Sequence, residues 1–131
     1  MRSLMEKIMN YRACIYLIAS VTLVGGAPAY ADPGAGKSQF NKICANCHTN
    51  RPDKNYIGPT LFGLIGRKSG SAPGFSYSDA MKNAGVTWDE ATLSKYLADP
   101  KAFIPGNKMP YAGVKKSNER EDIISYLSTL R

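Results

Sequence analysis

Two cysteines and a histidine lie within five consecutive residues, in the sequence Cys44-Ala45-Asn46-Cys47-His48. Two thiols three positions apart lie on one face of a helical turn, so both can reach the two vinyl groups of a single porphyrin. The imidazole that follows the second cysteine would then lie under the iron. Because C-x-x-C-H is typical of covalent attachment of a c-type haem, we predict that Cys44 and Cys47 hold one haem c and that His48 ligates its iron.

Two other kinds of site use cysteines at this spacing. A dithiol redox site of the thioredoxin type needs a βαβ pattern around the motif, and no such strand pattern flanks residues 44–48. A structural zinc site usually takes four Cys or His ligands, whereas residues 32–131 contain two cysteines and the single histidine of the chain. The residues therefore favour haem over both alternatives.

A second axial ligand for the iron has to come from another residue type, since His48 is the only histidine. Methionine is the next candidate, and Met81 and Met109 are the two methionines beyond residue 31. Met81 lies in a short helix-like stretch that ends at a glycine, where it can simply pack. Met109 lies in residues 103–110, where two prolines and a glycine favour an extended strap that can present a thioether to the iron. The setting favours Met109, with packing in the core as the alternative role.

The first 31 residues have the pattern of a secretory signal. Three basic residues precede an uncharged apolar run at residues 13–26, and Ala29-Tyr30-Ala31 supplies small residues for cleavage. A run of about 14 apolar residues is shorter than the roughly 20 that a membrane-spanning helix needs. We predict cleavage after Ala31, a mature domain at residues 32–131 and a periplasmic location. If the segment were retained, it would serve as a membrane anchor.

The mature region is basic and has no framework of disulfides. Cleavage would remove Arg2, Lys7, Arg12 and Glu6, which lowers the formal net charge from +7 to +5. Only two cysteines remain beyond the signal segment, and both belong to the C-x-x-C-H motif, so disulfides do not organise the domain. Nucleic acid is not an expected partner, because the basic residues follow no recognition motif.

Helices and loops account for the rest of the pattern. We expect a helix at about residues 36–47, a loop rich in Gly, Pro and Ser at 49–76, and a helix that begins at Thr87 or Asp89 and ends before Pro100. A last helix, capped at Ser117, should run to about Leu130. The chain shows no repeats and no alternating strand pattern, which indicates an all-α fold around the haem.

Further positions form a pattern that extends over most of the chain. They comprise Gly36, Phe40, Gly58-Pro59, Gly66-Arg67-Lys68, residues 72–77, Trp88, Tyr96-Leu97, Pro100, Ile104-Pro105-Gly106, Lys108-Met109 and residues 120–122. With these residues the chain closely resembles class I cytochrome c, the mitochondrial type and its short bacterial relatives, over residues 34–131. The resemblance implies one domain of helices and loops wrapped around a single covalent haem.

The resemblance also implies roles for residues around the haem. The carbonyl of Pro59 would accept a hydrogen bond from His48 and fix the orientation of the imidazole. Tyr77, Trp88 and Arg67 would satisfy a buried haem propionate, and Tyr96 would donate to the sulfur of Met109. For the aromatic residues, packing in the core is the alternative.

The resemblance also implies a close helix crossing, and the chain departs from the family pattern at three positions. Thr60 and Phe62 replace the usual Asn and His of the loop, and Met81 is the third. Gly36 and Phe40 would let the first helix cross the last one closely at Ile123 and Tyr126. Met81 departs from the family pattern, since its position is often held by Asn inside the pocket.

An iron with protein ligands on both faces has no open position for a substrate, so we predict a one-electron carrier and not an enzyme. The resemblance implies a soluble monomer that works in a respiratory chain, with a cytochrome bc1-type donor and a terminal oxidase or other reductase as partners. Two alternatives remain open: a haem peroxidase or gas sensor that uses the pocket after Met109 leaves, and a subunit permanently docked to a larger oxidoreductase.

Basic residues surround the expected strap and would steer a partner with an acidic docking surface. Simple solvation of these lysines is the alternative. The residues concerned are Lys101, Lys108, Lys115 and Lys116, and Lys42 and Lys54 would extend this ring.

Overall fold

The computed structural model describes residues 30–131. The signal segment that the sequence predicts lies outside the described residues except for its last two positions. Within residues 30–131, no helix is both long enough and apolar enough to cross a membrane.

Helices and long loops build the domain, as the sequence predicts. The helices are α2 (Pro33–Gln39), η2 (Phe40–Cys44), α3 (Asp79–Asn83), α4 (Glu90–Ala98), α5 (Pro100–Phe103) and α6 (Ser117–Ser128). The described part of the chain contains no strand, and a single antiparallel bridge joins Lys68 to Thr87. The expectation of an all-α fold is confirmed.

The first helix differs from its predicted bounds at both ends. It begins three residues earlier than expected, because the Asp32 side chain accepts a hydrogen bond from Gly34 N and Pro33 occupies the first helical position. From Phe40 the chain continues as the π-helical turn η2, in which Ala45 N donates to the carbonyl of Phe40, five residues back. The wider turn ends at Cys44, which is the first residue of the C-x-x-C-H motif.

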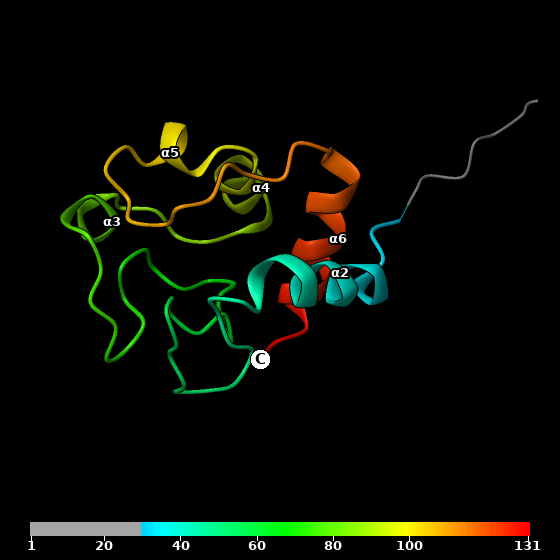
Figure 1. The fold of residues 1–131 in the computed structure, drawn as a ribbon, viewed down its shortest axis with the longest axis horizontal. Coiled ribbons are helices and arrows are strands. Elements are labelled where there is room, and N and C mark those ends of the chain that lie inside the picture. Colours follow the sequence, from blue (N-terminus) through cyan, green and yellow to red (C-terminus); the bar gives the residue numbers. More distant parts are fainter. Residues whose placement is uncertain (1–29) are drawn as a thin grey trace, which may run out of the picture.

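Helices α2 and α6 cross side by side (Figure 1). The crossing is close because Gly36 has no side chain: a Cβ at this position would lie 1.9 Å from the carbonyl oxygen of Asp122. The Phe40 and Tyr126 rings pack beside it with their centroids 5.3 Å apart. Phe40, Ile123 and Leu127 are almost completely buried at this crossing, which anchors one end of the domain.

Replacing Gly36 by alanine should destabilise the folded protein by about 1–3 kcal/mol, because the added methyl group forces the α2 and α6 backbones apart. The control is Gly34→Ala in the same helix, where the nearest atom to the new Cβ is a flexible Asp32 carboxylate oxygen 3.1 Å away. Denaturant unfolding of the holoproteins measures both changes. Equal stability of the two variants would show that the helices do not need this close approach.

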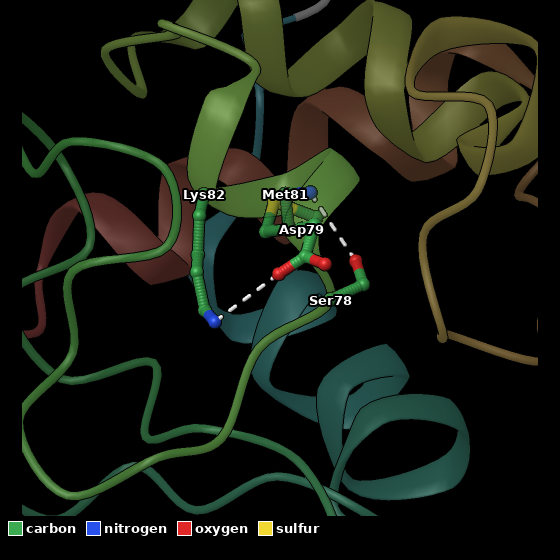
Figure 2. Close-up of polar contacts among 4 residues, drawn as sticks. All are labelled: Ser78, Asp79, Met81 and Lys82. Atoms are coloured by element: carbon green, nitrogen blue, oxygen red, sulfur yellow. Dashed lines mark hydrogen bonds and ion pairs between the residues drawn. The ribbon is translucent and has the colours of Figure 1, made fainter.

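The middle helices agree with the sequence pattern. Asp89 and Thr92 form a capping box at the start of α4, and α4 ends before Pro100. Ser78 caps α3, where its Oγ accepts from the Met81 amide at 3.2 Å (Figure 2). The loop between η2 and α3 contains no helix, as expected, and lies along one side of the molecule (Figure 1).

The predicted cap of the last helix is wrong. Ser117 is the first residue of α6, and Lys116 is its N-cap without a side-chain hydrogen bond. The Arg120 guanidinium donates to the carbonyls of Val114 and Lys115 at 2.8 and 2.9 Å. This arginine holds the preceding backbone against the first turn, so the helix begins without the help of a serine cap.

Candidate functional site

Cys44, Cys47 and His48 lie on one tight turn at the end of η2. The amides of Cys47 and His48 both donate to the carbonyl of Cys44, at 3.0 and 2.8 Å. Both thiols are free and partly buried. The turn therefore presents two thiols and an imidazole from a single helix end.

All three side chains line a cavity of about 280 Å³. Residues from every helix except α2 and α5 contribute to its walls, and most of them are apolar, including Leu64, Leu93 and Leu127. Met109 and Met81 also line it. An apolar cavity that combines two thiols, an imidazole and a thioether has the donor set that a covalent haem requires, so the residues fit this cofactor.

The imidazole of His48 is held in one orientation. Its Nδ1 lies 2.8 Å from the carbonyl oxygen of Pro59, and because a carbonyl can only accept, Nδ1 carries the proton. On one side the ring packs against Gly58, where a Cβ would lie 2.5 Å from Cε1. Burial lowers the pKa of His48, opposed by the Pro59 hydrogen bond, so the ring stays neutral and Nε2 keeps a free lone pair for a metal.

The strap that carries Met109 is held by a residue that the sequence analysis missed. The Asn107 side-chain amide donates to the carbonyls of Pro100 and Ile104, at 2.7 and 2.8 Å. Its oxygen accepts from the amide of Met109 at 2.9 Å. Asn107 follows Gly106, which has φ +87°, and the Pro-Gly-Asn sequence is the turn pattern that could have identified it.

The Tyr96 hydroxyl lies 3.8 Å from the Met109 sulfur and donates to it. Burial raises the pKa of Tyr96 to about 12, so the hydroxyl keeps its proton throughout the neutral range. Met81 is more deeply buried than Met109 and follows the Ser78 cap on α3 (Figure 2). Of the two methionines, Met109 is the one whose sulfur accepts a hydrogen bond from Tyr96. It is also the one that lies in an irregular segment whose backbone is held by a side chain, that of Asn107.

Arg67, Tyr77 and Trp88 line the same cavity. Arg67 donates to the carbonyls of Thr60 and Phe62, at 2.7 and 3.2 Å, so it holds the loop as well as facing the cavity. Burial raises the pKa of Tyr77, with Arg67 acting in the opposite direction. The Trp88 ring packs on Tyr96 with the centroids 5.0 Å apart. These three side chains bring polar atoms to an otherwise apolar wall.

The two other kinds of cysteine site do not fit. Burial raises the pKa of Cys44 to about 11, whereas a dithiol redox site needs a thiol whose pKa is lowered. Among the described residues, no three His, Cys, Asp or Glu side chains are grouped so that they could hold a metal ion. The motif therefore lacks the surroundings of both a thioredoxin-type site and a zinc site.

Comparisons with known proteins give a consistent result. The family model described as Cytochrome c matches residues 34–131. The chain is 50% identical over 115 residues to "Cytochrome c2" of Rhodomicrobium vannielii, covering 86% of this chain and 91% of that protein. It is 55% identical over 95 residues to "Cytochrome c-550" of Bradyrhizobium diazoefficiens, covering 72% and 69%. Among solved structures, cytochrome cH from Methylobacterium extorquens superposes with a TM-score of 0.70 at 45% identity, covering 75% of this chain and 98% of that one.

Proposed function

This chain belongs to the cytochrome c family and binds one covalent haem c, and we propose that it is a periplasmic one-electron carrier with His48 and Met109 as the axial ligands. When bound, the haem supplies a ferric/ferrous couple that accepts and gives up one electron. Members of the family carry electrons and are not enzymes, and the same holds for this chain. The observation that carries the proposal is the meeting of two thiols, one imidazole and one thioether on a single apolar cavity.

Each site residue has a defined task in this proposal. Cys44 and Cys47 would hold the cofactor through thioether bonds. His48 is oriented by Pro59, and Met109 is positioned by Asn107 and Tyr96. Because these contacts already hold the His48 and Met109 side chains in place, little of the protein would have to reorganise, and a thioether ligand would favour the ferrous state.

Arg67, Tyr77 and Trp88 supply the polar groups for the haem propionates. Trp88 lines the cavity, and its ring is almost fully buried. A buried indole usually finds a hydrogen-bond partner. Together with the Tyr77 hydroxyl and the Arg67 guanidinium, it offers donors to a carboxylate in the cavity.

For its partners we propose redox proteins with acidic docking surfaces: a cytochrome bc1-type donor, and a terminal oxidase or another reductase as acceptor. Lys108 lines the cavity beside Met109, and Lys101 is exposed on α5. Neither takes part in an ion pair within the described part of the chain, whereas Lys116 pairs with Glu119 and Lys115 donates to the Ala98 carbonyl. Lys101 and Lys108 are thus the cations best placed to attract a partner to the Met109 strap.

Reversing Lys101 and Lys108 to glutamate should slow electron exchange with an acidic partner by about tenfold at low ionic strength, because the charges accelerate diffusional encounter. Added salt should shrink the difference, since it screens charges over about 8–10 Å. Stopped-flow oxidation or reduction across a salt series measures this. Lys37→Glu on α2 is the control with smaller effect, and a rate insensitive to both salt and the double reversal would contradict electrostatic docking.

A further inference from the structure

The first residue of the predicted mature domain donates a hydrogen bond from its backbone to a side chain of the last helix. The amide nitrogen of Asp32 donates to Oδ1 of Asp122 at 2.8 Å. Asp32 is the N-cap of α2 and Asp122 lies in α6, next to the point where Gly36 allows the two backbones to touch. The bond therefore lies at the α2–α6 crossing that organises this end of the core.

The residue just before this bond lies among further carboxylates. Ala31 lines a second cavity of about 240 Å³ together with Glu90 at the start of α4 and Glu121 on α6. The other lining residues are Ser94, Ile124, Ser125 and Ser128. No basic side chain lines this cavity, so the link between Ala31 and Asp32 lies in acidic surroundings.

The proposed export signal ends at this same link. Hydrolysis of the Ala31–Asp32 peptide bond adds water across it: the C–N bond breaks, Ala31 leaves with a new carboxylate, and the nitrogen of Asp32 becomes an ammonium group. We propose that this processing completes an ionic lock, in which the new α-ammonium of Asp32 pairs with the Asp122 carboxylate and ties α2 to α6. The inference rests on the proposed export of the chain, whereas electron transfer itself does not depend on it.

Processing changes the charge of the Asp32 nitrogen and the number of hydrogen bonds that it can donate. Before cleavage, the amide offers one neutral N–H to Asp122. After cleavage, the same atom has three donors and a positive charge, which strengthens the hydrogen bond to a carboxylate. The positive end of the α2 dipole opposes an ammonium at this position, while the Asp122 carboxylate in direct contact with the nitrogen favours it. Glu90 and Glu121 line the cavity beside the preceding residue, Ala31. The direct contact with Asp122 therefore favours the charged form of the amino group.

The direction of the pH dependence follows from this balance. An α-amino group has an ordinary pKa of about 7.7–8.0, and nearby carboxylates raise it by favouring the charged form. A group whose pKa is raised on folding stabilises the protein below its unfolded pKa, and the contribution is lost as the pH rises through the folded value. The lock should therefore hold at neutral pH and open in mild alkali.

The test uses reduced holoprotein beginning at Asp32, with the Asp32 Cα chemical shift followed against pH. In Asp122→Asn the amide oxygen still accepts a hydrogen bond but has no charge, so the α-amino pKa should fall clearly below that of the unmodified protein. The control is Asp53→Asn, which removes one negative charge from an exposed loop position and should leave this pKa unchanged. The gap in unfolding midpoint between the unmodified protein and Asp122→Asn should close as the pH rises from about 7 to about 10.

Two results would overturn the lock. One is an α-amino pKa that is the same in the unmodified protein and in Asp122→Asn. The other is an intact mass of the exported protein that places its first residue elsewhere than Asp32. Haem content and the reduction potential, measured on the same samples, keep this outcome separate from the electron-carrier function, because neither should change in Asp122→Asn.

Discussion

Replacing both Cys44 and Cys47 by serine is expected to abolish all haem that stays with the polypeptide through denaturing electrophoresis. A thioether bond survives denaturation, whereas ligation by the proposed ligands His48 and Met109 would be lost when the cavity unfolds. Serine keeps the size and polarity of the side chain but replaces the sulfur that forms the bond. Haem-stained gels of exported protein, loaded at equal polypeptide amounts, measure the effect.

A matched control is available in the predicted signal segment. Cys14 is the third cysteine of the chain and lies outside the described residues, so Cys14→Ser should leave haem staining unchanged. Each single variant at Cys44 or Cys47 should lower the yield of stained protein, since one thioether holds the cofactor less firmly. Staining that persists in the double variant would refute covalent attachment at this motif.

Met109→Ala should remove the sulfur-to-iron charge-transfer band of the ferric protein and lower its reduction potential, because the substitution deletes a soft ligand that favours ferrous iron. Met81→Ala serves as the matched control, since it removes the other thioether that lines the cavity. Met81 is buried on α3, so this variant should lose stability by about 2–5 kcal/mol and keep the band. Ferric absorption spectra and redox titrations distinguish the two. If the band disappears in Met81→Ala and persists in Met109→Ala, the ligand assignment is reversed.

Much of the fold follows from local signals that tertiary structure does not override. Asp89 and Pro100 bound α4 through a capping box and a helix stop, and both act within a few residues of the chain. Residue types alone did not reveal the π-helical turn at Phe40–Cys44. A segment of five residues is too short for its hydrophobic pattern to distinguish a π-helical turn from an α-helical one. The cap at Ser117 failed for a related reason: the side chain of Arg120 binds the carbonyls of residues 114 and 115, a contact that depends on where the preceding strap runs.

In the candidate site, too, local features could be predicted from the sequence, whereas contacts between distant residues could not. The C-x-x-C-H motif is contiguous, so its chemistry could be inferred without a structure. The contacts of Pro59 with His48 and of Tyr96 with Met109 join residues 11 and 13 positions apart, and only the family resemblance implied them. Neither the residue pattern nor the family resemblance identified Asn107, because asparagine is common in turns. Its three hydrogen bonds are seen only in the folded strap. The roles of all these residues toward the haem stay predictions.

The central claim is that side chains of this chain occupy both axial positions of the iron, which makes the protein an electron carrier. The most direct test is the ferric absorption spectrum of the purified holoprotein at neutral pH. The account predicts a low-spin spectrum with a methionine sulfur-to-iron charge-transfer band. A high-spin or five-coordinate spectrum would contradict it, because an open axial position would let the iron bind a substrate or a gas.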